Sequence, residues 1–228
     1  MTFGTLIDRV KFTMGMQEIV SHNEVETLIK PYINEGIVDI LSRCRPYARS
    51  IQLQLTADTA IHDMASSILA LLDLQDSSGR FLQRFSREDI TKLQTEGSPG
   101  FAYEEPLLWI SPIPGPEAVV TAYGIFRPDP LSAPGDDPQM PNFGGLAPEF
   151  HPAIVNYACW KAGEYTQHDS SQMGEKWRVA YEGRDGTEGD IARIKRILTK
   201  RVTPQAARKR DLTGNLGALS ESGSYMGG

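Results

Sequence analysis

The spacing of hydrophobic residues changes twice along the chain. Up to about residue 45 apolar side chains recur every three or four positions, from about 49 to 126 they alternate, and after 150 the longer spacing returns. A period near 3.6 indicates helices with one buried face, and a period of 2 indicates strands with one buried face. We therefore predict an α+β fold, a helical bundle with an inserted small antiparallel β-domain and an extended C-terminal arm.

The same change of pattern predicts the domain boundaries. The 228 residues are enough for one large domain or two small ones. A Pro- and Gly-rich stretch before residue 151 is too long for a simple connection and is treated as a segment of its own. The predicted segments are 1–47, the N-terminal helices; 48–130, the inserted antiparallel β-domain; 131–150, the connecting loop; 151–190, helices that complete the bundle; and 191–228, a basic C-terminal helix and flexible tail.

Local signals predict where some elements begin and turn. Thr5 and Asp8 have the spacing of a capping box for a helix over 5–14, and Pro31 predicts a kink or a new start in the following helix. In the β-domain, "QDSSG" and "IPGPE" each lie between two strand-like runs, which predicts two hairpins.

Charge is distributed unevenly. The net charge of -6 combines 15 basic and 27 acidic residues over 1–190, eight basic and no acidic residues over 191–210, and two acidic residues over 211–228. The last eighteen residues are rich in Gly and Ser and cannot form a core. An acidic body thus carries a basic arm, which makes an acidic or nucleic-acid partner electrostatically plausible.

The remaining composition favours a cytoplasmic protein. Cys44 and Cys159 are the only cysteines and suggest neither a disulfide framework nor a metal site. No window approaches eighteen apolar residues, and the first sixteen residues carry Asp8, Arg9 and Lys11 instead of a signal sequence. We expect neither export nor membrane insertion.

No group of residues has the pattern of an active site. His151 precedes Pro152 at the start of a predicted helix, where an imidazole is better suited to capping a backbone N–H than to acting as a general base without a partner. "FGGLAP" lacks the Lys and Ser/Thr of a phosphate-binding loop, and Cys159 lies on an apolar stripe. We expect no catalytic residue, no metal and no cofactor.

Two further sets of residues are candidates for contacts. Ala158, Ala162 and Gly163 are small enough to let their helix pack closely against another helix or another subunit. The apolar stripe of the basic arm needs a partner, which is either this protein's own body or another chain. The arm comprises Ile191, Arg193, Ile194, Lys195, Arg196, Leu198, Lys200, Arg201, Val202, Arg208, Lys209 and Arg210.

Over residues 5 to 202, the order of the elements resembles the head-to-tail adaptor proteins of tailed bacteriophages, the ring bound beneath the portal. The stretches that carry the resemblance are "LIDRVKFTMG", "YINEGIVDILSRCRPYA", "GRFLQRFSREDITKLQTEGSPGFAYEEPLLWISPIPGPEAVVTAYGIFRPDPL" and "PEFHPAIVNYACWKAGEYTQHDSSQMGEKWRVAYEG".

The resemblance implies a virion structural protein without enzymatic activity, located in the neck and assembled in the host bacterial cytoplasm. It implies a homo-oligomeric ring, expected to be a dodecamer, with genomic DNA passing through its centre. The implied partners are the portal protein, bound by the C-terminal arm, and a downstream neck or head-closure protein. Alternatives are a head-closure or tail-completion neck protein, a nucleic-acid-binding module that uses the basic arm, and an enzyme or small-molecule-binding protein on an α+β fold.

Overall fold

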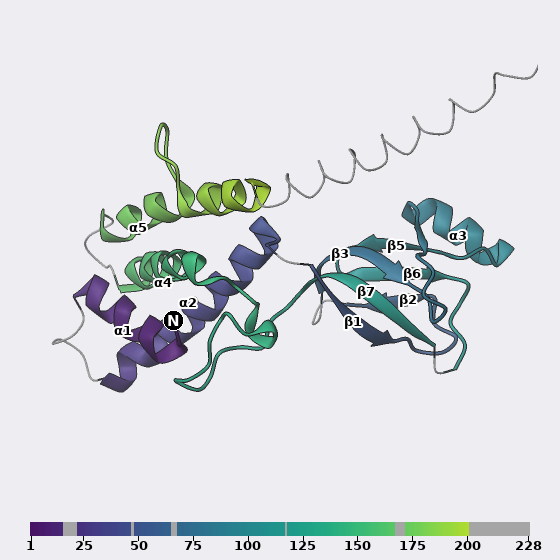
Figure 1. Cartoon of the computed structure of the whole chain (residues 1–228), viewed down its shortest axis with the longest axis horizontal. Helices are drawn as coiled ribbons and strands as arrows, with labels where there is room; N and C mark the ends of the chain where they lie inside the picture. Colours follow the sequence, from purple (N-terminus) through teal and green to yellow (C-terminus); the bar gives the residue numbers. More distant parts are fainter. Residues whose placement is uncertain (16–21, 47, 65–67, 117, 167–171, 201–228) are drawn as a thin grey trace, which may run out of the picture.

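The chain folds into a helical bundle and a β-domain that lie side by side (Figure 1). The structure is a computed structural model, and it describes residues 1–15, 22–46, 48–64, 68–116, 118–166 and 172–200. The chain leaves the bundle at the end of its second helix and returns to it after the last strand. The α+β class, with a β-insertion between helices, is confirmed.

The bundle is built from the two ends of the chain. Two helices precede the β-domain, and two more and a C-terminal helix follow the connecting loop, which contains two short 3-10 turns. Their bounds are α1 Phe3–Met14, α2 His22–Cys44, η1 Pro141–Phe143, η2 Pro148–Phe150, α4 His151–Thr166, α5 Gln172–Glu182 and a final helix at residues 190–200.

Helix α2 is continuous through Pro31. A proline inside a helix costs about 3 kcal/mol because it removes one hydrogen bond and crowds the preceding turn. On the same helix Ile29, Ile33, Ile37 and Ile40 are fully or almost fully buried, and burying an isoleucine contributes about 1.5–3 kcal/mol. Four such side chains outweigh the proline, so the apolar stripe and not Pro31 determines the length of the helix.

Helix α1 begins earlier than predicted. Thr2, and not Thr5, is its N-cap residue, and Phe3 is buried at 1% exposure in the first turn. The Thr5 hydroxyl instead lies 3.0 Å from the Thr2 hydroxyl. The capping-box prediction was wrong because burial of Phe3 favours a helix that includes it.

The β-domain contains two small sheets and one helix. One sheet has the order β1-β7-β3 and the other the order β2-β6-β5-β4. All pairs are antiparallel except the short pair of β4 with β5. The bounds are β1 Arg49–Gln54, β2 Ile61–Asp63, β3 Ile68–Gln75, β4 Gln83–Arg84, α3 Arg87–Glu96, β5 Gly100–Glu104, β6 Leu107–Ser111 and β7 Val119–Phe126.

Of the two predicted hairpin turns, only the one at "QDSSG" pairs the residues that flank it. Asp76 accepts hydrogen bonds from the backbone N–H groups of Ser78 and Arg80, and Leu82 N–H donates to Leu74 C=O. The hairpin predicted at "IPGPE" was wrong, because β6 and β7 lie in different sheets. Three prolines in this connection have no N–H to contribute to a ladder, so the chain passes from one sheet to the other.

The two modules share part of one core. Leu69, Ala70 and Ile125 of the β-domain belong to the same buried cluster as α1, α2 and α4. Strand β3 passes very close to β7 there, since a Cβ on Gly124 would lie 2.3 Å from the carbonyl oxygen of Ala70. Only glycine allows this approach. A second cluster fills the space between the two sheets.

The helix of residues 190–200 belongs to the bundle. Ile191 and Ile194 are 4% and 1% exposed in the main core, and Leu198 packs against it. At its start the Asp190 carboxylate accepts hydrogen bonds from Asn156 of α4 and from Arg193. The apolar stripe of the predicted arm is therefore covered by the protein's own body as far as the structure describes it.

We expect that Ile194→Ala lowers the free energy of unfolding by about 3 kcal/mol, since it removes a fully buried side chain and leaves a cavity. Lys195→Ala, on the exposed face of the same helix, serves as the matched control and should change the free energy by less than about 0.5 kcal/mol. Urea denaturation followed by circular dichroism measures both. Equal effects of the two variants would show that residues 190–200 do not contribute to the core.

Candidate assembly surfaces

His151 joins the start of α4 to the N-terminus and the connecting loop. The ring is fully buried, with Nδ1 2.8 Å from the Met1 amino group and Nε2 3.2 Å from the Leu146 carbonyl oxygen. Neither contact is with a helix N–H, and His151 itself has helical angles, φ -59° and ψ -35°. The predicted cap is corrected to a buried contact between segments, which forms because the 3-10 turn η2 leads directly into the helix.

The protonation state of His151 is set by this burial. Burial lowers the pKa of the imidazole, the Leu146 carbonyl opposes that shift, and the nearby α-amino charge adds to it. The neutral ring is therefore favoured in the folded protein.

The small residues of α4 contact helices of the same chain. Ala158 and Ala162 are fully buried, and a Cβ on Gly163 would lie 3.1 Å from the Cα of Gly174 in α5. This close approach brings α4 and α5 together. The structure therefore contains a helix-against-helix contact at these residues, and packing against another subunit stays a prediction.

A polar network ties α2 to α5 beside this contact. Arg43 donates two hydrogen bonds to Glu182, 2.5 and 2.6 Å long, and the Tyr181 hydroxyl donates to Asp39 at 2.5 Å. The Arg43 guanidinium lowers the pKa of Glu182, and burial with the Asp39 carboxylate raises that of Tyr181. Because bidentate charge-assisted bonds are directional, the network sets the angle between the two helices.

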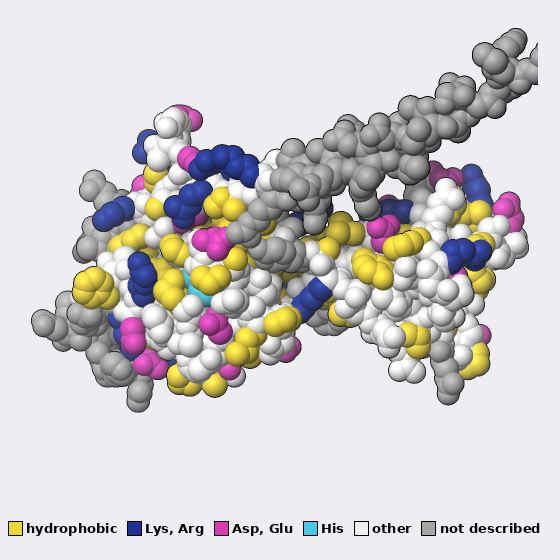
Figure 2. All heavy atoms as spheres, viewed as in Figure 1, with side chains coloured by type: hydrophobic (Ala, Val, Ile, Leu, Met, Phe, Trp, Pro, Cys, Tyr) yellow, Lys and Arg dark blue, Asp and Glu magenta, His cyan; other side chains and the backbone are white. Residues whose placement is uncertain are grey.

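The C-terminal helix presents a basic outer face. Dark-blue side chains lie along the upper edge of the bundle, over α5 and residues 190–200 (Figure 2). Arg193 and Arg196 pair with Asp190 and Glu188, whereas in the described residues no salt bridge engages Lys195 or Lys200. The other predicted arm residues, Arg201, Val202, Arg208, Lys209 and Arg210, lie outside the described part of the chain.

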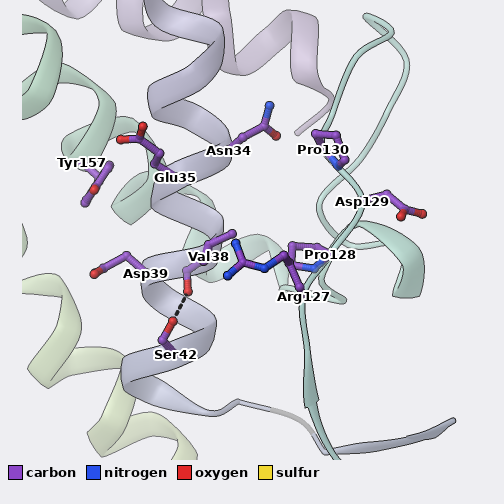
Figure 3. A pocket seen from close by; sticks show the side chains of 10 residues that line it. All are labelled: Asn34, Glu35, Val38, Asp39, Ser42, Arg127, Pro128, Asp129, Pro130 and Tyr157. Atoms are coloured by element: carbon purple, nitrogen blue, oxygen red, sulfur yellow. Dashed lines mark hydrogen bonds between the residues drawn. The ribbon is translucent and has the colours of Figure 1, made fainter. Parts of the chain in front are cut away.

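A groove lies between α2 and the segment that follows β7. It has a volume of about 510 Å³ and is lined by both apolar and charged side chains. Figure 3 shows Glu35, Asp39 and Tyr157 on one side of it, with Arg127 reaching toward α2 from the other. Asn34 fixes the geometry, because its amide exchanges two hydrogen bonds with the backbone of Leu131.

The charge of the groove is negative near Tyr157. Burial and the carboxylates of Asp39, Glu35 and Glu164 raise the pKa of the Tyr157 hydroxyl to about 12. Among the described residues no salt bridge engages Glu35, whereas Asp39 bonds to Arg43. Glu35 is thus available to a cation from outside the chain.

Several large hydrophobic side chains are exposed, on the β-domain, on α1 and, with Met140 at 49%, in the connecting loop. Ile61, Leu72, Phe81 and Ile113 are 41–57% exposed on the β-domain, and Phe12 at the end of α1 is 70% exposed. Contiguous apolar patches are typical of surfaces that contact other proteins, whereas single exposed apolar side chains are ordinary.

The described residues contain no arrangement suited to metal binding, since no three His, Cys, Asp or Glu side chains come together. Burial raises the pKa of the Cys159 thiol to about 12, which makes it a poor nucleophile at neutral pH. Within the same residues, no helix combines the length and the apolar character needed to cross a bilayer.

Comparison with protein families gives one match that covers most of the chain. The model of the family described as SU10 adaptor protein matches residues 1–208. The chain belongs to the SU10 adaptor protein family. The resemblance to phage head-to-tail adaptors is thereby confirmed, and the protein is a structural adaptor of the virion.

Other comparisons add little. No curated protein matches the sequence. One solved structure with a similar chain is the neck of an empty gene transfer agent particle, computed with C6 symmetry, at 15% identity and a TM-score of 0.33 over 86% of this chain and 91% of that one. The likeness is weak, and the assignment rests on the family match.

Sequence reasoning missed the groove and the α2–α5 network of the adaptor. The spacing of Glu35, Asp39 and Arg43 along one face of α2 is a visible signal of a polar stripe. The partners Arg127, Tyr181 and Glu182 come from distant parts of the chain, so no local pattern could identify them.

We expect the adaptor to lose stability between pH 7 and pH 5 in part through His151. Its pKa is lowered in the folded state, so as the pH falls through about 6.5 the unfolded chain binds a proton that the folded chain does not, and the free energy of unfolding decreases. His151→Gln keeps hydrogen-bonding groups but cannot titrate. Thermal melts at both pH values should show a smaller loss for the variant, and an equal loss would show that His151 does not contribute.

Proposed function

We propose that the adaptor forms a ring beneath the portal of a tailed bacteriophage and joins the DNA-filled capsid to the next neck or tail protein. The observation that carries this proposal is the family match over residues 1–208. Assembly would take place in the host bacterial cytoplasm, and the ring would have the portal's symmetry, expected to be twelve-fold. DNA would pass through its centre.

The basic arm is the portal-docking element in this proposal. The exposed charges of residues 190–200 continue into Arg201, Arg208, Lys209 and Arg210 without an intervening acid. Because Ile191 and Ile194 lie in the core, we assign docking to the part of the arm that follows residue 200. The folded helix would then anchor this segment to the bundle.

The acidic body suits a channel through which DNA moves. Residues 1–190 hold an excess of twelve negative charges. A negative channel wall repels the phosphate backbone, so DNA would slide along it without being retained, whereas a basic wall would bind it and release counterions.

The β-domain supplies a surface of different chemistry. Its exposed hydrophobic side chains lie on the module next to the bundle, away from the basic helix at residues 190–200. We propose that this module contacts the downstream neck or head-closure protein. An adaptor needs two unlike surfaces for two unlike partners, and in this proposal the two modules would provide them.

Deletion of residues 201–228 should reduce binding to purified portal at least about tenfold, a loss of about 1.4 kcal/mol or more, while the circular dichroism spectrum stays unchanged. Deletion of 211–228 is the matched control, since it removes only the Gly- and Ser-rich tail and should keep binding. Deletion from 191 is unsuitable, because it also removes core residues.

Biolayer interferometry with immobilised portal measures the affinities, and native mass spectrometry of the mixture gives the number of copies bound. Full affinity after deletion of 201–228 would contradict docking through this segment. A salt-sensitive shift of DNA by the protein alone, without portal binding, would favour the nucleic-acid-binding alternative.

A further inference from the structure

The outer face of α1 is an exposed surface with a prominent aromatic residue, and its Arg9 donates a hydrogen bond to Met1 Sδ. Thr5, Asp8, Arg9 and Phe12 are exposed and spaced so that they share one side of the helix. At 70% exposure, Phe12 is the most exposed of the large hydrophobic side chains in the described residues. In the same residues no salt bridge engages Asp8 or Arg9.

The groove beside α2 is complementary to this face in shape and charge. Val38, Pro128, Pro130 and Tyr157 give it apolar walls. Its volume of about 510 Å³ exceeds the roughly 150 Å³ that is enough to hold a benzene ring. It therefore has room for a phenylalanine side chain.

The charges at the rim of the groove match those beside Phe12. Glu35 lies next to Tyr157, where the nearby carboxylates already disfavour a further negative charge. An arginine from outside would relieve that repulsion. On the other wall Arg127 reaches toward α2 and has no carboxylate partner in the described part of the chain. Arg9 and Asp8 carry the two opposite charges.

The two surfaces cannot meet within one chain. Figure 1 shows α1 at the end of the bundle that is remote from the β-domain, whereas the groove lies where the chain leaves β7 and rejoins the bundle. The exposed face of α1 on one copy can therefore contact the groove beside α2 only on another copy. Such a head-to-tail contact is heterologous, and it generates a ring when the rotation between copies closes.

We propose that Phe12 of one copy inserts into the groove beside α2 of a second copy, with Arg9 facing Glu35 and Asp8 facing Arg127. This contact rests on the proposed ring for its biological use, but it is a property of the chain alone and needs no portal. In the ring, other contacts, including those with the portal, would hold neighbouring copies together. The contact of Phe12 with the groove would then repeat between each pair of neighbours.

The contact is tested by photo-crosslinking of the full chain without portal. Phe12 is replaced by p-benzoylphenylalanine in unlabelled protein, which is mixed with ¹⁵N-labelled wild-type protein at about 1 mM, where contacts with millimolar dissociation constants form. Mass spectrometry should find cross-links from residue 12 of unlabelled chains to residues 34–42 or 127–130 of labelled chains. The same replacement at Phe81, which is 57% exposed on the β-domain, is the matched control and should not label the groove.

A charge exchange tests the pairing of Arg9 with Glu35. On the cross-linking background, Arg9→Glu and Glu35→Lys should each lower the yield of groove cross-links about fivefold, and the double variant should recover at least half of it, as expected for residues in direct contact. If the single variants lowered the yield only by disturbing the fold, the double variant would not recover the yield of groove cross-links.

Cross-links from residue 12 only to other regions, only within one chain, or none at all would overturn the proposal. Equal yields in all charge variants would overturn the Arg9–Glu35 pairing. Neither result changes the portal affinity of the arm deletions, so this contact and the proposed function fail independently.

Discussion

The fold depends on the packing of α2 against helices that follow it only after the whole β-domain. Ile33, Ile37 and Ile40 of α2 share a core with Ile154 and Ala158 of α4. The pairing closes a loop of more than a hundred residues, and the loss of chain entropy on closure grows only slowly with loop length. Because the loop folds as a domain of its own, the bundle can be assembled from both ends of the chain without a large further cost.

The same constraint explains the position of the C-terminal helix. After α5 the chain makes a short projecting hairpin, bridged at Arg184 and Thr187, and the helix of residues 190–200 then continues along the line of α5 (Figure 1) and contributes Ile191 and Ile194 to the core. Asp190, Asn156 and Arg193 fix the start of this helix. The basic face is therefore displayed by an element that packs in the core.

Much of this architecture could be predicted from the sequence, because it is encoded locally. The change of hydrophobic period indicates the β-insertion between helices, and the Ile191–Ile194 spacing predicts a helix with one buried face. What could not be predicted depends on tertiary contacts. The passage of β6 and β7 into different sheets, the continuity of α2 through Pro31 and the bonds of His151 to Met1 and Leu146 are all decided by residues far apart in sequence.

Of the candidate surfaces, too, one could be predicted from the sequence and the other could not. The charge of the arm is visible in the sequence, whereas the groove exists only once Arg127, Tyr157 and α2 are brought together. The central claim is that residues 190–200 are part of the folded body before any partner binds. Hydrogen–deuterium exchange of the free protein tests it most directly. We predict that the amides of residues 194–200, whose intrahelical bonds lie in this helix, exchange as slowly as those of α5, and exchange at the rate of an unfolded peptide would contradict the account.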